Sequence, residues 1–82
     1  MNRKEIEKKI VDIISNISEH KNIEIDEPLV SYGVDSFMFI NIIVEIEKKL
    51  NIRIEDEYLS FEKFDRISSM VTIVEKIKEI SE

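Results

Sequence analysis

The chain of 82 residues contains no cysteine, no tryptophan, one glycine, one proline and one histidine. Without cysteine it can form no disulfide, offer no thiolate nucleophile and build no cysteine-ligated metal site. The single histidine, His20, stands among Glu19, Lys21 and Asn22, so we expect it in solvent, without a second ligand or a nucleophile beside it. Any thiol that this protein uses must therefore come from another molecule.

The charge balance is acidic, with 18 Asp and Glu residues against 12 Lys and Arg residues and a formal net charge of −6. Such a field disfavours nucleic acid and favours partners with basic docking surfaces. No apolar run is long enough for a signal peptide or a membrane span, so we expect a cytoplasmic protein. The 43% of hydrophobic and 37% of charged residues suit a small folded unit, and we expect residues 1–82 to form one monomeric domain.

Apolar residues recur at spacings of three and four in three stretches, which predicts three longer helices. The first covers about residues 3–18, the second runs from residue 35 or 36 to about residue 51, and the third is capped by Ser68 or Ser69. Acidic residues predict a short helix near residues 56–60. We therefore expect an all-α fold, a four-helix bundle with three longer helices and one short helix.

The second helix is apolar on more sides than one core face requires. At about 100° per residue, one arc supplies the core and consists of Phe39, Ile42, Ile43, Ile46 and Leu50. A second arc, about 130° away, holds Phe37, Ile40 and Val44. Either the core extends far enough to bury Ile40, or this second arc is a docking surface, and its apolar clustering favours docking.

The helical period is broken over residues 20–34, which predicts a long connecting loop. Apolar residues within it can anchor it across the bundle, so we expect an ordered loop; these anchors are Ile23, Ile25, Leu29 and Tyr32. The loop ends in the tract Gly33–Val34–Asp35–Ser36. Asp35 suits the N-cap position, which leaves Ser36 at the first helical position with its hydroxyl facing outward. A phosphodiester on this oxygen would lie at the positive end of the helix dipole.

This tract, the preceding Pro28–Leu29 and the segment Ile67–Ser68–Ser69–Met70 resemble the modification site of acyl and peptidyl carrier proteins, and the resemblance extends from Ile6 to about Ile77. It implies a phosphopantetheinyl transferase that moves 4'-phosphopantetheine from coenzyme A to Ser36. The thiol of this covalent arm then holds an acyl or aminoacyl group as a thioester for loading and synthase enzymes.

The resemblance also implies roles for neighbouring residues. Asp35 corresponds to an aspartate near the magnesium ion of the transferase complex, and Gly33 to the glycine that lets the loop turn tightly. The second helix corresponds to the recognition helix of the family, which gives Phe37, Ile40 and Val44 a partner-docking role.

Catalysis by the chain itself has little support. A nucleophilic Ser36 needs a base, and His20 lies on a different predicted loop, while Asp35 serves as a cap. The carboxylates are spread over solvated helix faces and form no metal site. We therefore expect a protein that is not an enzyme. The alternative is an unmodified helical adaptor that binds a protein through Phe37, Ile40 and Val44 and tolerates the loss of Ser36.

The sequence departs from carriers of fatty-acid synthesis in its second helix. Those carriers usually have an acidic helix there, whereas this one contains Asn41, Lys48 and Lys49, with only Glu45 and Glu47 acidic. The segment 58–67 is also longer than in those proteins. Both features resemble discrete carriers of specialised pathways, including those loaded with amino acids by adenylating enzymes and the D-alanyl carriers of cell-wall modification, and favour a free-standing carrier outside housekeeping lipid synthesis. The sequence identifies neither the cargo nor the pathway, which can be that of fatty acids, polyketides, nonribosomal peptides or D-alanylation.

Overall fold

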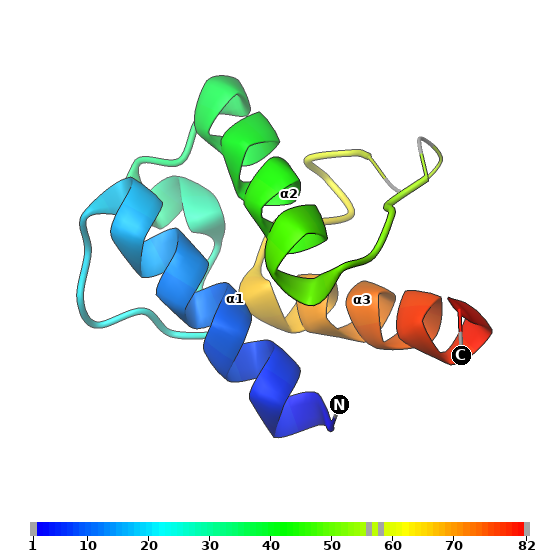
Figure 1. The fold of residues 1–82 in the computed structure, drawn as a ribbon. Coiled ribbons are helices and arrows are strands. Elements are labelled where there is room, and N and C mark those ends of the chain that lie inside the picture. The colour runs from blue at the N-terminus through cyan, green and yellow to red at the C-terminus, as the bar shows by residue number, and fades with distance from the viewer. Residues whose placement is uncertain (1, 56, 58, 82) are drawn as a thin grey trace.

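The computed structural model describes residues 2–55, 57 and 59–81, and this part of the chain contains helices and no strand. Its α-helices are α1 (Arg3–Ser18), α2 (Ser36–Leu50) and α3 (Ile67–Ser81), and a 3₁₀ turn, η1 (Leu29–Tyr32), lies in the first connection. Helix α1 packs against both α2 and α3 (Figure 1). In this view α2 begins at the top, while the chain enters α1 at the bottom. The expected all-α fold is confirmed.

Helix α1 begins where the sequence predicts, because the side chain of Asn2 caps it. The Oδ1 atom of Asn2 accepts a hydrogen bond from the Glu5 N–H at 2.9 Å. The helix ends at Ser18, after which Glu19 adopts a left-handed conformation with φ 59°. One face of α1 is buried, and it consists of Ile6, Ile10, Ile13 and Ile14. Ile17 is half-buried at the edge of the core.

Helix α2 supplies the central part of the core. The residues of its predicted core arc are all buried: Phe39, Ile42, Ile43, Ile46 and Leu50. Asn51 ends the helix in a left-handed conformation with φ 52°. The side chain of Glu47 then accepts a hydrogen bond from the Ile54 N–H at 2.9 Å, which fixes the chain as it leaves the helix.

Helix α3 begins at Ile67, earlier than the sequence predicts, and the expected cap by Ser68 or Ser69 is wrong. Both serines lie inside the first turn. The N–H of Ser68 belongs to the first turn and has no partner inside the helix; it donates to the carbonyl of Ile25 at 2.9 Å, so a distant segment satisfies it. Ile67 itself is fully buried, which pulls the start of the helix into the core.

The short helix expected over residues 56–60 includes Asp56 and Tyr58, which lie outside the described residues, so it stays a prediction. A short helical element is instead described in the first connection, at Leu29–Tyr32. Pro28 precedes this turn and Gly33 ends it, the arrangement typical of a short helical segment. The sequence contained this signal, but only a loop was predicted here.

The connection between α1 and α2 is ordered, as predicted, because hydrogen bonds hold it against the segment that opens α3. The N–H of Leu29 donates to the carbonyl of Asp65 at 2.7 Å, and the Arg66 guanidinium donates to the carbonyl of Asp26 at 3.0 Å. Leu29 is fully buried. Three further anchors pack against the core: Ile23, Ile25 and Tyr32. We call this set of contacts between residues 25–29 and 65–68 the loop clasp.

None of the helices in the described ranges is both long and apolar enough to cross a lipid bilayer.

Candidate functional site

The approach to α2 turns at Gly33, whose φ of 77° and ψ of 15° lie in the left-handed region. Its N–H donates to the Val30 carbonyl at 3.1 Å and closes the turn of η1. A Cβ built on Gly33 would meet no atom within 4 Å. The requirement for glycine is therefore conformational and does not come from crowding.

Val34 anchors the loop immediately before α2, a role that the sequence reasoning missed. Its side chain is buried, with 3% of its surface exposed, and its N–H points to the Leu29 carbonyl at 3.4 Å. Because Val34 enters the core, the two residues after it emerge at the surface. An apolar residue between glycine and the capping aspartate was the available signal.

Asp35 and Ser36 begin α2 as predicted. The Oδ1 atom of Asp35 accepts from the Met38 N–H at 2.9 Å, and its carbonyl accepts from the Phe39 N–H at 2.9 Å. Ser36 occupies the first helical position and is exposed. Within the described part of the chain its hydroxyl makes no hydrogen bond. A phosphate ester on this oxygen fits the site, because it would meet solvent and the positive end of the helix dipole.

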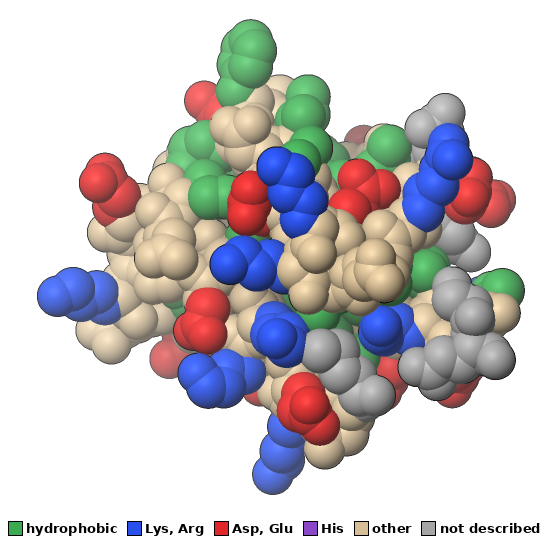
Figure 2. All heavy atoms as spheres, in the orientation of Figure 1, with side chains coloured by type: hydrophobic (Ala, Val, Ile, Leu, Met, Phe, Trp, Pro, Cys, Tyr) green, Lys and Arg blue, Asp and Glu red, His purple; other side chains and the backbone are tan. Residues whose placement is uncertain are grey.

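The second apolar arc of α2 lies outside the core. The exposed fractions are 82% for Phe37, 59% for Ile40 and 40% for Val44. The alternative in which the core buries Ile40 is therefore wrong. Hydrophobic side chains are visible at the top of the molecule in Figure 2, where α2 begins. We call Phe37, Ile40 and Val44 the exposed stripe; it starts at the residue after Ser36 and follows the helix.

A groove of about 470 Å³ opens beside Ser36, between α2 and the segment at residues 59–61. Apart from Ser36 and Glu47 its lining is apolar, formed by Phe39, Ile40, Ile43, Val44, Leu59 and Phe61. The ring of Phe61 stacks on that of Phe39, with centroids 5.0 Å apart and an angle of 6° between the planes. Phe61 is half-buried and forms one wall of this groove.

Within the described ranges, no carboxylate or imidazole forms a hydrogen bond with the Ser36 hydroxyl. His20 is exposed, as predicted, and its ring lies edge-on to Tyr32 with centroids 5.4 Å apart. Among the described residues it forms no hydrogen bond with Ser36, and Asp35 is engaged as the cap. No cluster of three or more His, Cys, Asp or Glu side chains is placed to hold a metal ion in the described ranges.

A comparison with known protein families matches residues 8–74 to the family described as phosphopantetheine attachment site. The chain belongs to this family. The matched range includes the tract from Gly33 to Ser36, all of α2 and the first half of α3. Searches among curated proteins and among solved structures gave no match.

Membership of the family confirms the resemblance to acyl and peptidyl carrier proteins and the expected cofactor, a covalently attached 4'-phosphopantetheine. In this family the protein chain serves as a point of attachment and other enzymes act on what it carries. The all-helical fold agrees with this family.

Proposed function

We propose that the protein is a carrier that holds an acyl or aminoacyl group as a thioester on a phosphopantetheine arm attached to Ser36. The observation that supports this most strongly is the exposed, unengaged hydroxyl of Ser36 at the first position of α2, in a chain of the phosphopantetheine attachment family. The bound arm supplies a thiol, which this cysteine-free chain lacks. The carrier acts without catalytic groups of its own.

Each residue around Ser36 has a separate part in this proposal. Gly33 lets the chain turn, Val34 holds the turn to the core, and Asp35 fixes the first turn of α2. Together they present one hydroxyl in a defined position to an approaching transferase. Asp35 also brings a carboxylate next to the modified oxygen, where a metal ion of the transferase can use it.

The exposed stripe is the proposed docking surface for the transferase and for loading and synthase enzymes. The apolar side chains begin directly after Ser36, so a partner enzyme can bind the exposed face of α2 while its active site receives the arm. Tethering then raises the effective concentration of the cargo at whichever active site the carrier docks against. We expect the carrier to act as a monomeric single domain in the cytoplasm, in a pathway outside housekeeping lipid synthesis.

The test is an intact-mass measurement after incubation with coenzyme A and a broad-specificity phosphopantetheinyl transferase. We expect the mass of one phosphopantetheine to be added, and peptide mapping to assign it to Ser36. The Ser36→Ala protein is the matched control and should gain no mass. Folded protein that stays unmodified with several active transferases contradicts the proposal.

The competing function is an unmodified adaptor that uses only the exposed stripe. The same exposure of Phe37, Ile40 and Val44 supports it. The two functions differ at Ser36, because an adaptor keeps its activity in the Ser36→Ala protein and a carrier loses it.

A further inference from the structure

A hollow of about 530 Å³ lies where the start of α1, the segment before α3 and the first half of α3 meet. It shares no residue with the groove beside Ser36. Its lining consists of Arg3, Lys63, Ser68, Ser69, Thr72, Ile73 and Lys76. Three cations and three hydroxyls are gathered here without a lining carboxylate, in a chain where acidic residues outnumber basic ones by 18 to 12.

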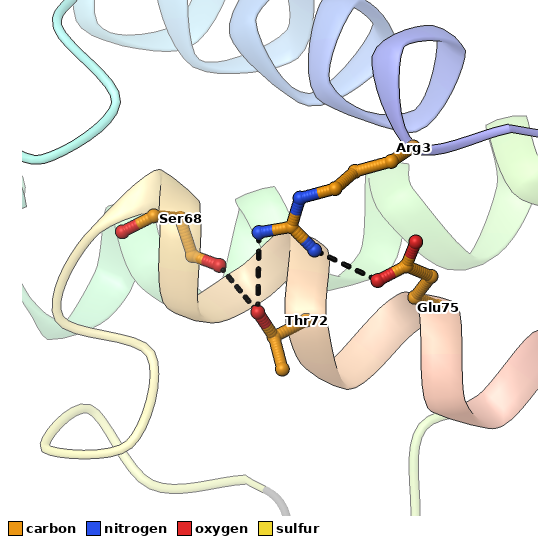
Figure 3. A network of polar contacts seen from close by, with 4 residues as sticks. All are labelled: Arg3, Ser68, Thr72 and Glu75. Atoms are coloured by element: carbon orange, nitrogen blue, oxygen red, sulfur yellow. Dashed lines mark hydrogen bonds and ion pairs between the residues drawn. The ribbon is translucent and has the colours of Figure 1, made fainter.

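Arg3 is held in a defined position above the hollow. Figure 3 shows its side chain reaching from α1 to α3, with the guanidinium beside Thr72 and Glu75. One nitrogen donates to Glu75 Oε1 at 2.7 Å and the other terminal nitrogen donates to Thr72 Oγ1 at 3.3 Å. Thr72 in turn donates to the Ser68 carbonyl at 3.1 Å. These contacts use part of the five-donor guanidinium, which can still donate to a bound oxyanion.

The two lysines of the hollow form no ion pair with another described residue. Lys63 donates to the backbone carbonyl of Glu57 at 3.0 Å, a neutral partner. Lys76 forms no ion pair within the described ranges. Glu75 pairs with Arg3 at 2.7 Å, and Asp65 pairs with Arg66 at 3.1 Å. Lys63 and Lys76 are therefore the two cations of the hollow without an ion-pair partner in the described part of the chain.

The serines add a second source of positive potential. Ser68 and Ser69 lie in the first turn of α3, a helix of 15 residues, so the positive end of its dipole faces this region. The dipole alone would not define a site. Here it coincides with a hollow and with cations from α1, from the segment before α3 and from α3 itself.

We propose that the hollow formed by Arg3, Lys63, Lys76 and the hydroxyls of α3 binds the phosphate group of a small molecule. A phosphate monoester carries a charge of about −1.5 to −2 near neutral pH, which suits two lysines that lack an ion-pair partner among the described residues better than a single carboxylate does. Its three terminal oxygens accept hydrogen bonds from ammonium, guanidinium and hydroxyl donors.

The test is a titration of the ¹⁵N-labelled protein with inorganic phosphate, with sodium chloride adjusted to keep the ionic strength constant. We expect saturable shifts of the amide signals of Ser69, Thr72 and Ile73. The Lys63→Gln and Lys76→Gln proteins should each bind phosphate about threefold more weakly. The Lys4→Gln protein is the matched control, because Lys4 neighbours Arg3, is exposed and lies outside the lining.

Two further titrations identify the ligand class. Tighter binding of adenosine monophosphate than of phosphate supports an organic phosphate ester, and equal binding assigns the site to phosphate itself. The proposal is overturned if shifts do not saturate, if acetate binds as tightly as phosphate, or if Lys4→Gln weakens binding as much as Lys76→Gln does. The Ser36→Ala protein should bind phosphate like the wild type, so this test is independent of the carrier function.

Discussion

Ser36 is exposed and its side chain makes no hydrogen bond in the described part of the chain, so its hydroxyl contributes little to folding. We expect Ser36→Ala to change the free energy of unfolding by less than about 0.5 kcal/mol. Circular dichroism melting curves measure this directly, alongside the loss of the phosphopantetheine adduct. A large loss of stability would instead identify a structural serine and weaken the proposed attachment role.

Glycine is required at position 33 for its backbone conformation. Replacing it should lower the free energy of unfolding through backbone strain, and not through a clash with neighbouring atoms. At a φ of 77°, Gly33→Ala should destabilise the protein by about 1–2 kcal/mol, because an L-residue with a Cβ is strained there. Gly33→Asn is the matched control and should cost less, since asparagine tolerates the left-handed region. Chemical denaturation of both proteins makes the comparison. Equal losses for alanine and asparagine would contradict this explanation.

At the scale of one element, α2 offers two isoleucines with opposite surroundings. Ile46 is fully buried and Ile40 is 59% exposed. Ile46→Ala should cost about 2–5 kcal/mol, because it removes buried methylenes and leaves a cavity, and this is enough to unfold much of a small protein. Ile40→Ala should leave the protein folded. Melting curves of this matched pair test the assignment of the two faces, and similar losses would show that the stripe belongs to the core.

A charge on the exposed stripe should impair docking without unfolding the protein. Ile40→Asp and Val44→Asp place a carboxylate where an apolar partner surface is proposed to bind, so both should slow phosphopantetheine transfer to Ser36. The melting temperature should shift little. Lys49→Asp, a change at another exposed position of the same helix outside the stripe, serves as the control. Unchanged transfer rates in the stripe variants would remove the docking role from these residues.

The sequence predicts an element well when local chemistry sets its limits. The starts of α1 and α2 were predicted because Asn2 and Asp35 cap them with their own side chains. The start of α3 was missed because its backbone bonds to the carbonyl of Ile25, a partner about 40 residues away that no local pattern reveals. The residues proposed as the site, from Gly33 to Ser36, could be predicted for the same reason, because neighbouring residues set their local conformation. The groove beside them was not, because Leu59 and Phe61 come from a distant segment.

At the scale of the whole molecule, the loop clasp joins the connection before α2 to the segment that opens α3. Arg66 takes part through its hydrogen bonds to the Asp26 carbonyl and to the carboxylate of Asp65. The hydrogen bond from Arg66 lowers the pKa of Asp65 below its ordinary value of 3.8. The contribution of this pair to stability is therefore present above the unfolded pKa of Asp65 and is lost as the pH falls through the folded pKa.

This linkage predicts a pH-dependent effect of Arg66→Gln. The variant should melt at a lower temperature than the wild type near neutral pH, and the difference should shrink as the pH falls through the folded pKa of Asp65. The effect should be small, because both side chains are partly exposed to solvent. Arg53→Gln removes the same charge from an exposed position and controls for net charge. A difference between Arg66→Gln and wild type that persists undiminished in acid would show that the Asp65 pair is not its source.

The loop clasp also determines where an arm on Ser36 would pivot. Backbone hydrogen bonds from Leu29 and Ser68, together with buried Val34, fix the loop on both sides of the turn. The position of Ser36, where the arm would be attached, is therefore fixed relative to the core. The cargo would then sweep a hemisphere whose centre is fixed by the fold and whose radius is the length of the arm alone. The local concentration of the cargo at any point of that hemisphere would fall with the cube of the radius, because the accessible volume grows in that proportion. A looser loop would enlarge the radius and dilute the cargo without changing a single contact at a partner's active site.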